Sequence, residues 1–350
     1  MYMKILHIIN DLSKNGGAQR FLIDLVSHYD PHFEIKVLIL SDENEYQAEL
    51  KECGVEYLSW KSLTFQQKWN LLRWPDLVHG HLYPSIYLAL LAIGKKRLQT
   101  EHNTTNRRRD YPMLKFMEYW LYKSFDMTIC ITGRVQEELI RFMPRYQSKY
   151  SVVYNGVELS KFTMQPKIRS AFAKDKVFKI GMAGRLHNYK DHESLLRAMQ
   201  SLPQNYELHL AGGGPKQEEL QALATSLGIE QRVHWYGVIS DIPNFLNSLD
   251  VYVQSSLVEG FGLASVEAMA SGLPVLGSDV PGLDEVIGDS RYLFPTGSPT
   301  LLADKILTIT NDIDTYNEAS RYSVERASLY TIDKFREGYY AAYAQLCPEK

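Results

Sequence analysis

The sequence has little cysteine and no long apolar run. Its three cysteines, Cys53, Cys130 and Cys347, lie far apart, and no Cys-x-x-Cys pair or Cys/His cluster accompanies them. This pattern indicates neither a disulfide framework nor a zinc site, and it favours a reducing, cytoplasmic compartment. The longest apolar stretch, residues 83–94, is shorter than the roughly 20 residues that a membrane-spanning helix needs. We therefore expect no transmembrane helix.

A strong net charge is also missing. The formal net charge is −3, which gives the whole chain no general attraction for nucleic acid. The apolar and charged fractions, 45% and 23%, are ordinary for a soluble globular protein. A length of 350 residues is too great for one typical core and predicts two domains of about 150–200 residues each.

Short apolar runs alternate with helical patterns in the first half of the chain. Residues 4–9 are followed by Gly16 and Gly17 and then by apolar residues at helical spacing, which predicts a strand, a glycine loop and a helix. Further strand-like runs occur at residues 34–40, 77–81, 97–102 and 127–132, with helical patterns at 85–93 and 113–124 between them. This alternation predicts a parallel sheet with helices on both faces.

A second series of the same kind follows a polar stretch, residues 151–176, which has the composition of a linker. Its strand-like runs lie at residues 178–183, 206–211, 232–239, 250–256, 273–278 and 291–295. Another polar segment, residues 311–322, precedes a terminal helix in which Thr331 is a candidate N-cap and aromatic residues share one face. The sequence therefore predicts two doubly wound α/β halves in tandem.

Residues 258–278 carry two glutamates around the start of a predicted helix. A strand leads into a glycine loop that holds Glu259, and Glu267 lies inside the helix that Gly272 and Pro274 close. A helix start after glycines suits a diphosphate, while carboxylates accept hydrogen bonds from hydroxyls. A nucleotide sugar has both groups, so the glutamates would hold its two rings. For two glutamates alone, a loop residue and a helix-favouring residue remain the alternative.

The same stretch, EGFGLASVEAMASGLPVLGSDVPGLDEVI, closely resembles the signature of the retaining GT-B glycosyltransferases of family four. Other motifs agree in order along the chain: NGGAQR, EHN, YNGVELSKF and AGRLHNYKDHESLLRAM. The resemblance implies an α/β GT-B fold of two Rossmann-like domains that face each other across a cleft. It divides the chain into an acceptor domain, residues 1–158, and a nucleotide-sugar donor domain, residues 159–327. The C-terminal helix, residues 328–347, would cross back and dock on the acceptor domain.

The resemblance also assigns roles to side chains. Arg185 and Lys190 match the cations on the donor diphosphate, where fixed positive charge stabilises the leaving phosphate. Glu259 matches the residue that binds the donor sugar, Glu267 the one that holds the ribose hydroxyls, and His102 the histidine near the transferred sugar. The implied catalytic set is His102, Glu259, Arg185 and Lys190. Gly16 and Gly17 match the first-domain loop that approaches the phosphates and the reacting centre. The other implied donor positions are Gly184 directly before Arg185, Tyr236 and Val238 near the base, and Gly260, Phe261, Gly262 and Leu263 near the phosphates.

The expected function is that of a retaining hexosyltransferase that uses no metal and no cofactor. It would move a hexose or N-acetylhexosamine from a UDP-sugar to a glycan acceptor, expected to be lipid-linked, in surface polysaccharide or glycoconjugate biosynthesis. Asp312-Ile313-Asp314 resembles a cation-binding DxD but follows a helical pattern, which favours a solvated pair. A catalytically idle relative that binds nucleotide sugar as an accessory subunit remains the alternative, and an epimerase or phosphorylase has less support.

Basic and aromatic residues are interleaved between residues 95 and 149. This composition suits a surface that rests on anionic lipid at the cytoplasmic face of a membrane. A solvated face with buried aromatics and an RNA-binding patch stay open as alternatives, although no RNA-binding motif accompanies the charge. The residues assigned to this membrane or acceptor surface are Arg107, Arg108, Arg109, Lys115, Trp120 and Lys123.

Overall fold

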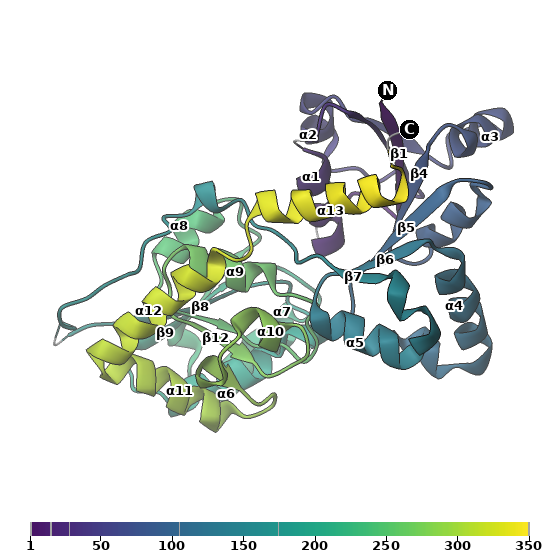
Figure 1. The fold of residues 1–350 in the computed structure, drawn as a ribbon. Helices are drawn as coiled ribbons and strands as arrows, with labels where there is room; N and C mark the ends of the chain where they lie inside the picture. The colour runs from purple at the N-terminus through teal and green to yellow at the C-terminus, as the bar shows by residue number, and fades with distance from the viewer. Residues whose placement is uncertain (1, 15, 28, 105, 174, 349–350) are drawn as a thin grey trace. The chain divides into compact units, whose positions relative to one another are not determined.

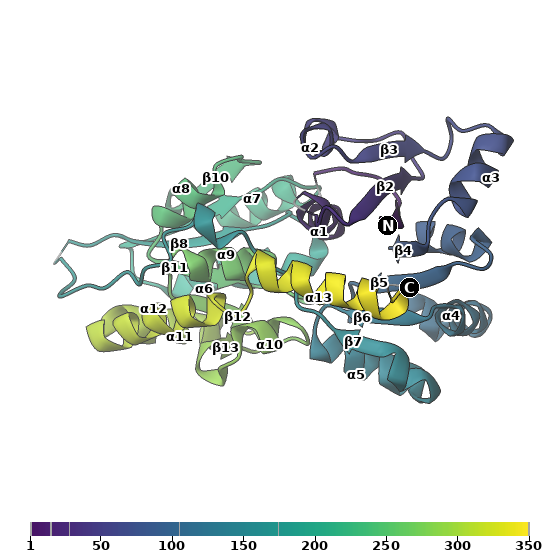
Figure 2. The same cartoon turned by 45° about the horizontal axis from the view of Figure 1, so that its top comes forward.

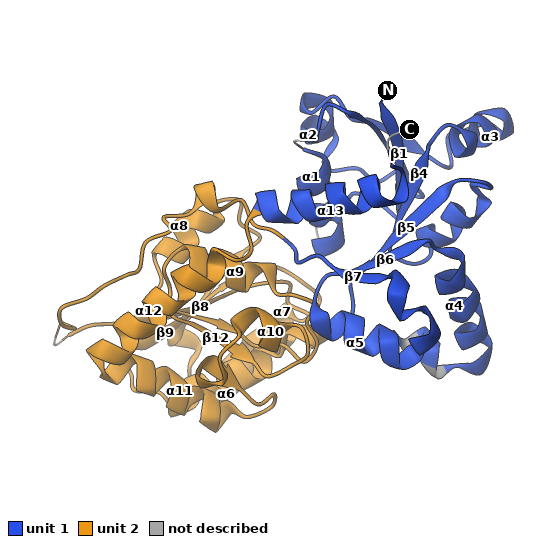
Figure 3. Ribbon diagram, viewed as in Figure 1, with its two compact units in different colours: residues 1–155, 332–350 blue, residues 156–331 orange. Residues whose placement is uncertain are grey.

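The computed structural model describes residues 2–348 apart from residues 15, 28, 105 and 174, and it does not describe the side chains of residues 107 and 110. The chain forms two compact units (Figures 1 and 3). Unit 1 contains Met1–Asn155 together with Ile332–Lys350, and unit 2 contains Gly156–Thr331. The chain therefore passes from unit 1 to unit 2 and back again.

Unit 1 is built on a seven-stranded sheet in which every pair of neighbours is parallel. The strand order is β3-β2-β1-β4-β5-β6-β7. Its strands are β1 (Met3–Ile9), β2 (Phe33–Ile39), β3 (Glu56–Ser59), β4 (Leu77–His81), β5 (Lys96–Glu101), β6 (Met127–Cys130) and β7 (Tyr150–Val152). Its helices are α1 (Gly17–Val26), α2 (Gln47–Glu52), α3 (Phe65–Arg73), α4 (Pro112–Ser124), α5 (Gly133–Phe142) and α13 (Ile332–Leu346), with 3-10 turns η1 (Ser85–Leu91), η2 (Arg107–Asp110) and η3 (Pro144–Lys149).

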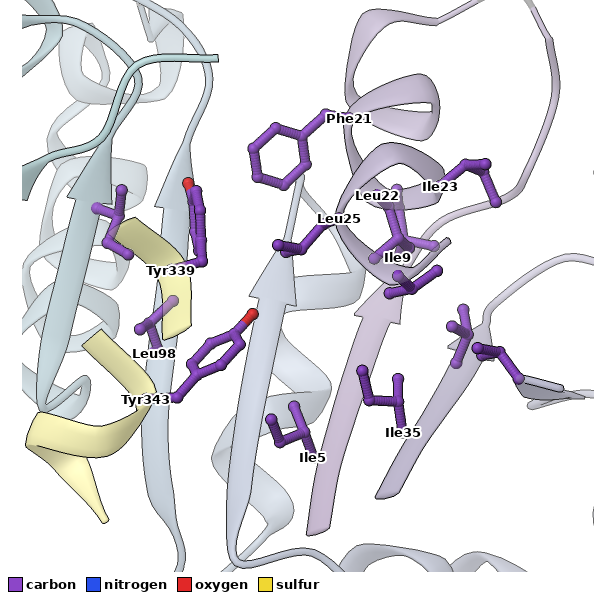
Figure 4. Packing of buried hydrophobic residues seen from close by; sticks show 14 of the residues in the cluster. Ile5, Ile9, Phe21, Leu22, Ile23, Leu25, Ile35, Leu98, Tyr339 and Tyr343 are labelled. Carbon is purple, nitrogen blue, oxygen red and sulfur yellow. The ribbon is translucent and has the colours of Figure 1, made fainter. Parts of the chain in front are cut away.

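Helices cover both faces of this sheet because its central strands are apolar on both sides. One hydrophobic cluster joins strand residues such as Ile5 and Leu98 to α1 and α13. Figure 4 shows this cluster, with Tyr339 and Tyr343 of α13 beside the strands. The other cluster joins Leu6 and Val78 to side chains of α3, η1 and α4. Both faces are thus removed from water, as a parallel sheet requires.

Unit 2 has a six-stranded parallel sheet in the order β10-β9-β8-β11-β12-β13. Its strands are β8 (Phe178–Ala183), β9 (Tyr206–Ala211), β10 (Val233–Gly237), β11 (Val251–Gln254), β12 (Val275–Ser278) and β13 (Leu293–Phe294). Its helices are α6 (His192–Ser201), α7 (Gln217–Ser226), α8 (Ile242–Asn247), α9 (Leu263–Ala270), α10 (Leu283–Ile287), α11 (Pro299–Asn311) and α12 (Ile313–Ala327), with 3-10 turns η4 (Leu159–Lys161), η5 (Asn188–Lys190), η6 (Glu230–Arg232) and η7 (Ser290–Tyr292).

Each sheet follows the strand order of a Rossmann fold, which confirms the predicted pair of doubly wound α/β halves. In both, the chain reverses its winding between the first strand and the fourth, β1 and β4 in unit 1 and β8 and β11 in unit 2. In folds of this kind, ligands bind at the carboxyl ends of the strands next to that reversal. Functional side chains are therefore sought at those ends.

Three local predictions differ from the structure. The short strands β3 and β7 have no separate place in the sequence pattern, and residues 85–91 form a 3-10 turn rather than an α-helix. The segment 311–322 is not a polar connection, because most of it belongs to the 15-residue helix α12. Asp312 caps this helix by accepting a hydrogen bond from the Thr315 amide at 2.8 Å. Apart from Tyr316, the buried face of α12 consists of small and polar side chains, so its apolar period is weak.

The terminal helix α13 follows unit 2 in the chain but belongs to the core of unit 1 (Figures 2 and 4). Its buried residues are Ile332, Phe335, Tyr339, Ala342, Tyr343 and Leu346. In the described part of the chain, no helix combines the length and the apolar character needed to span a membrane.

Candidate functional site

In unit 2, the residues assigned to the donor follow the carboxyl ends of β8, β10 and β11. Gly184, Arg185 and Lys190 come after β8, Val238 after β10, and Glu259 lies between β11 and α9. The strand ends meet at one edge of the sheet because all of its neighbouring strands are parallel. The loops can therefore act on one ligand although they lie far apart in the chain.

Lys190 and Glu259 are the central pair of this edge. The Lys190 ammonium donates a hydrogen bond to Oε2 of Glu259, and the Ser256 hydroxyl lies 3.4 Å from the same oxygen. Backbone contacts hold both loops, because the Leu257 amide donates to the Tyr189 carbonyl at 2.7 Å. The side chains of Lys190 and Glu259 remain 24% and 15% exposed, so a ligand can still reach them.

The start of α9 has the geometry of an anion site. Gly262 caps the helix at φ 89° and ψ 55°, a left-handed conformation that favours glycine. The first amides of a helix have no partner within it, and they lie at the positive end of its dipole. The Ser265 hydroxyl in this first turn is fully buried and has no hydrogen-bond partner among the described residues. The sequence analysis missed Ser265, although a serine three residues after a glycine cap was a usable signal.

Both glutamates act on the buried phenol of Tyr252 in β11. Burial raises the pKa of Tyr252, and the negative charges of Glu267 and Glu259 raise it further. The Tyr252 hydroxyl donates to Oε1 of Gln254 at 2.8 Å and accepts from the Ala183 amide at 3.3 Å. The two carboxylates that the sequence placed on either side of the helix start thus both act electrostatically on one side chain of unit 2.

Close backbone approaches explain three glycines around these loops. A Cβ at Gly212 would lie 1.9 Å from the Gly184 carbonyl oxygen, and one at Gly282 would lie 2.6 Å from the carbonyl oxygens of Glu259 and Gly260. A Cβ at Gly214 would lie 2.3 Å from the Leu186 carbonyl oxygen. The loops after β8, β9, β11 and β12 therefore pack backbone against backbone, which only glycine permits.

The remaining donor positions of unit 2 differ in exposure. Arg185 and Val238 are exposed, whereas the ring of Phe261 is buried and meets Tyr330 edge-on at 5.2 Å. Phe261 can therefore act on a ligand through its backbone only. The Tyr236 hydroxyl lies 2.9 Å from Nδ1 of His209, which holds the ring at the end of β10.

In unit 1, the residues assigned to the reacting end of the donor lie near α1. Gly16 caps this helix and Gly17 begins it, and a Cβ at Gly17 would meet no atom within 4 Å. His102 follows β5, and its ring meets Phe21 of α1 edge-on at 4.8 Å. Burial lowers the pKa of His102 to about 3, so the imidazole is neutral at physiological pH. Its Nε2 atom is buried without a hydrogen-bond partner in the described part of unit 1.

Three more histidines, His7, His79 and His81, lie fully buried on the strands beside His102. Nδ1 of His7 lies 3.0 Å from Nε2 of His81, and Nδ1 of His79 lies 2.8 Å from the hydroxyl of Tyr343 in α13. Burial lowers the pKa of all three, that of His7 to about 3. They form a neutral hydrogen-bonded layer between the sheet and α13.

A cavity of about 340 Å³ in unit 1 opens next to His102. Polar side chains from the end of β5 and the loop after it line the cavity together with Tyr83 and Tyr122. Its polar lining residues include Gln99, Thr100, Glu101, Asn103, Asn106 and Arg108. Such a mixture of aromatic rings, amides and charged groups can bind a hydroxyl-rich ligand.

Arg108 lines this cavity, and both Arg108 and Arg109 are held inside unit 1 rather than at an open surface. Nε of Arg108 lies 3.0 Å from Oε1 of the fully buried Glu118, and its guanidinium covers the Tyr83 ring at 3.9 Å. Nη2 of Arg109 lies 3.0 Å from Oε2 of Glu101. Both arginines are therefore paired with carboxylates. The side chain of Arg107 lies outside the described part of the structure.

The outer face of α4 is apolar, aromatic and basic. Lys115, Trp120 and Lys123 are all exposed on this helix, and the Lys123 ammonium covers the Trp120 ring at 4.6 Å. The exposed apolar residues of this segment are Tyr111, Met113, Phe116, Met117, Tyr119 and Trp120. We call these six residues with Lys115 and Lys123 the α4 patch. An apolar patch of this kind marks an interaction surface.

Two protein-family models match the chain. The model described as "Glycosyltransferase Family 4" matches residues 15–161, and the one described as "Glycosyl transferases group 1" matches residues 164–326. An uncharacterized glycosyltransferase of Methanocaldococcus jannaschii is 32% identical over 292 residues, which cover 78% of this chain and 70% of that protein. A Campylobacter jejuni protein, named as an N-acetylgalactosamine-N,N'-diacetylbacillosaminyl-diphospho-undecaprenol 4-alpha-N-acetylgalactosaminyltransferase, is 25% identical over 303 residues, 79% of this chain and 82% of that protein.

Solved structures share the fold. The Anabaena protein HepE, in complex with UDP and glucose, has a TM-score of 0.85 and 20% identity, and the match covers 98% of this chain and 100% of that chain. WaaG, a glycosyltransferase involved in lipopolysaccharide biosynthesis, has a TM-score of 0.71 and 14% identity, covering 99% of this chain and 100% of that chain. At these identities the likeness shows the GT-B architecture and nothing finer.

Proposed function

Because this chain belongs to the group 1 glycosyltransferases of the GT-B fold, we propose that it transfers a hexose or N-acetylhexosamine from a UDP-sugar to a lipid-linked glycan. The observation that carries this proposal is the edge of unit 2 where Lys190 and Glu259 meet beside the glycine-capped start of α9. A cation and a helix start together suit a diphosphate, and the carboxylate suits a sugar hydroxyl.

The choice of donor and acceptor is supported by relatives. The Anabaena structure holds UDP and glucose, and a relative from Escherichia coli is named as a galactosyltransferase that uses UDP-Gal and a diphosphoundecaprenol-linked acceptor. That relative is 28% identical over 265 residues, 70% of this chain and 65% of that protein. We carry both features over to this chain, and we place the product in surface polysaccharide or glycoconjugate biosynthesis.

The proposed chemistry retains the configuration of the anomeric carbon. The bond between that carbon and the phosphate oxygen breaks, and the nucleoside diphosphate leaves with the electron pair. The acceptor hydroxyl attacks the same face of the sugar, and its proton passes to the leaving phosphate. Arg185 and Lys190 stabilise the negative charge that grows on this phosphate, so the step uses no metal ion. Glu259 orients the sugar, and catalysis consists mainly of positioning and electrostatics.

The neutral imidazole of His102 is suited to the sugar side of this reaction. A ring with its pKa lowered to about 3 does not protonate at neutral pH, so Nε2 of the neutral ring can form one hydrogen bond with a sugar hydroxyl. The cavity beside His102 offers polar groups for the acceptor. We assign this cavity to the glycan part of the acceptor.

The lipid part of the acceptor requires the enzyme to work at a membrane. We assign membrane contact to the α4 patch, because it combines exposed aromatic rings with Lys115 and Lys123. Each cation near an anionic surface contributes about 1 kcal/mol. Arg108 and Arg109 have no part in this contact, since carboxylates within unit 1 hold them. The proposed location is the cytoplasmic face of the membrane.

A nucleotide titration tests the donor assignment first. The purified chain is melted with UDP, GDP and ADP, since a ligand above its dissociation constant raises the melting temperature by mass action. We expect UDP to stabilise the wild type and Glu267→Ala to lose most of this response. Glu325→Ala, which removes an exposed glutamate from α12, is the matched control and keeps it. A response of equal size in both variants contradicts the site.

Transfer itself distinguishes the enzyme from an idle accessory subunit. UDP-sugars are incubated with the protein and a polyprenyl-diphosphate-linked glycan in vesicles, and UDP release and the lengthened glycan are measured. An idle relative binds the nucleotide in the melting experiment, but it releases UDP from the UDP-sugar no faster than a sample without protein does. Release that depends on the acceptor establishes the transferase.

A further inference from the structure

A group of metal-ligating side chains lies on the sheet of unit 2, apart from the strand ends that form the donor site. Glu207 and His209 are two residues apart on β9 and therefore point to the same face. His234 is the register partner of His209 on β10, the edge strand. The two imidazole rings stack at 4.6 Å, so three potential ligands meet on one surface.

We propose that Glu207, His209 and His234 bind one divalent transition-metal ion of the zinc class. Nε2 of His209 lies 3.3 Å from Oε2 of Glu207, and Nε2 of His234 lies 3.4 Å from the same oxygen. Two ligand atoms at zinc bond lengths and a tetrahedral angle are separated by about 3.3 Å. Nitrogen–oxygen hydrogen bonds are shorter, about 2.9 Å. The spacing thus suits a shared cation better than two hydrogen bonds.

The surroundings of the ligands agree with this assignment. Nδ1 of His209 lies 2.9 Å from the Tyr236 hydroxyl, and this contact orients the ring so that Nε2 faces Glu207. The buried Nε2 atom of His234 has no hydrogen-bond partner among the described residues.

The site is open enough to load and to hold a fourth ligand. The side chain of His234 is 41% exposed and that of Glu207 is 32% exposed, whereas His209 is buried. A water molecule can complete the tetrahedron from the solvent side. A nearby positive group is Lys179 of β8, which is the register partner of Glu207. Its charge opposes a bound cation and so limits the affinity.

The second histidine group of the described residues, His7, His79 and His81, is a weaker candidate. Its members are fully buried, and both nitrogens of His79 already have partners, the hydroxyls of Tyr343 and Thr100 at 2.8 Å each. A metal would have to displace these bonds. The Glu207 group requires no such loss.

A metal at this position would act on the proposed donor site by positioning. It would hold the ring of His209, and His209 would hold Tyr236, which the proposed function places near the nucleotide base. This consequence rests on the proposed function, but metal binding itself does not. The metal would take no part in the transfer step at Lys190 and the leaving phosphate. The proposed reaction therefore still needs no catalytic metal.

Direct titration tests the site without any nucleotide. The full chain is treated with a chelator, dialysed, and titrated with Zn²⁺ by calorimetry and with Co²⁺ by visible absorption. We expect one bound ion and a tetrahedral Co²⁺ spectrum. His234→Ala and Glu207→Gln each weaken Zn²⁺ binding at least about tenfold, the size of loss that changes at metal sites produce. Both residues are partly exposed, so these variants fold.

Two further variants sharpen the result. His32→Ala removes an exposed histidine that pairs with Asp30 at 2.6 Å in unit 1, and it leaves Zn²⁺ binding unchanged. Lys179→Gln removes the opposing charge and tightens binding, which a merely structural role of the cluster would not produce. No Zn²⁺ binding by the wild type, or equal binding by the wild type and His234→Ala, overturns the proposal. Binding of UDP to the protein is measured separately. Failure of the metal site is therefore distinguishable from failure of the proposed donor site.

Discussion

At the scale of single residues, the pair of Lys190 and Glu259 joins two functions in one contact. The carboxylate keeps the ammonium in place in the absence of ligand, and the ammonium offsets the cost of holding a carboxylate at a partly buried position. A diphosphate can take over the cation, which releases the carboxylate for a sugar hydroxyl. In the proposed function, the same pair would serve both halves of a nucleotide sugar.

Lys190→Ala tests this arrangement. We expect the dissociation constant for UDP to rise at least about tenfold, because a charge-assisted contact contributes roughly 1.5–3 kcal/mol. Arg197→Ala is the matched control, since Arg197 forms an exposed pair with Glu193 on α6. Calorimetric titration measures both variants. If Arg197→Ala weakens UDP binding as much as Lys190→Ala does, the effect is not specific to the site.

Gly262→Ala tests the helix start. A Cβ there would lie 2.8 Å from Leu283 and in a left-handed conformation, which costs roughly 1–2 kcal/mol for other residues. Gly228→Ala carries the same strain, at φ 68°, without any atom within 4 Å. We expect both variants to lose stability in thermal melts but only Gly262→Ala to lose UDP binding. Normal UDP binding by Gly262→Ala contradicts an anion site at α9.

At the scale of elements, α13 and α4 contribute to unit 1 in opposite ways. α13 buries its aromatic face against the sheet, and its Tyr343 and Tyr339 hydroxyls form hydrogen bonds with His79 and Thr100 of the sheet. α4 buries Leu121, Tyr122 and the paired Glu118 but leaves its aromatic outer face exposed. One helix completes the core, and the other offers a surface.

Tyr343→Phe tests the role of α13. The variant keeps the ring but removes the partner of His79 Nδ1, and an unsatisfied buried polar group costs about 1–3 kcal/mol. We expect a loss of this size in the free energy of unfolding, measured by urea denaturation. Tyr111→Phe, at an exposed position, serves as the control and changes little. Equal stability of Tyr343→Phe and the wild type argues against the bond.

Trp120→Ser tests the α4 patch. Vesicles with and without anionic lipid are floated with the protein, and we expect the wild type to float with the anionic ones. Trp120→Ser lowers the floating fraction, whereas Trp69→Ser, which removes an equally exposed tryptophan from α3, does not. Lys115→Glu with Lys123→Glu lowers it further by charge reversal. Flotation that none of these variants changes rules out membrane contact through α4.

At the scale of the whole molecule, the two units differ in their sensitivity to acid. His7, His79, His81 and His102 of unit 1 all have lowered pKa values, because they are buried. In the unfolded chain a histidine titrates near pH 6.5. Below this pH the unfolded state therefore binds protons that the buried rings of the folded state do not bind. The stability that these neutral rings contribute is therefore complete above about pH 6.5 and is lost as the pH falls towards the folded values.

We expect unit 1 to open before unit 2 as the pH is lowered from 7 to 5. Each histidine contributes up to about 1.4 kcal/mol per pH unit in this range, and unit 2 has fewer such groups in its described part, His192 and His209. Hydrogen exchange followed by mass spectrometry measures the strands of both units. The prediction fails if the strands of unit 2 lose protection first.

Much of this molecule follows from local patterns in the chain. Alternating strand and helix periods predicted most elements of both sheets, and the glycines around Glu259 and Glu267 predicted a helix start at a strand end. These features depend on residues that are close in sequence, because hydrophobic period, caps and turns are local. The sequence pattern did not predict β3, β7 and α12, because their apolar signals are short or weak.

The sequence by itself thus determined the α/β class, the two halves, the family resemblance and the residues at the edge of unit 2. Only the tertiary structure decided that Arg108 and Arg109 turn towards Glu118 and Glu101 and leave α4 to form the exposed patch. It also brought His209 and His234 together on neighbouring strands, where the sequence had indicated no metal site. Such contacts join residues far apart in the chain, and strand order and register, which no local pattern contains, select them.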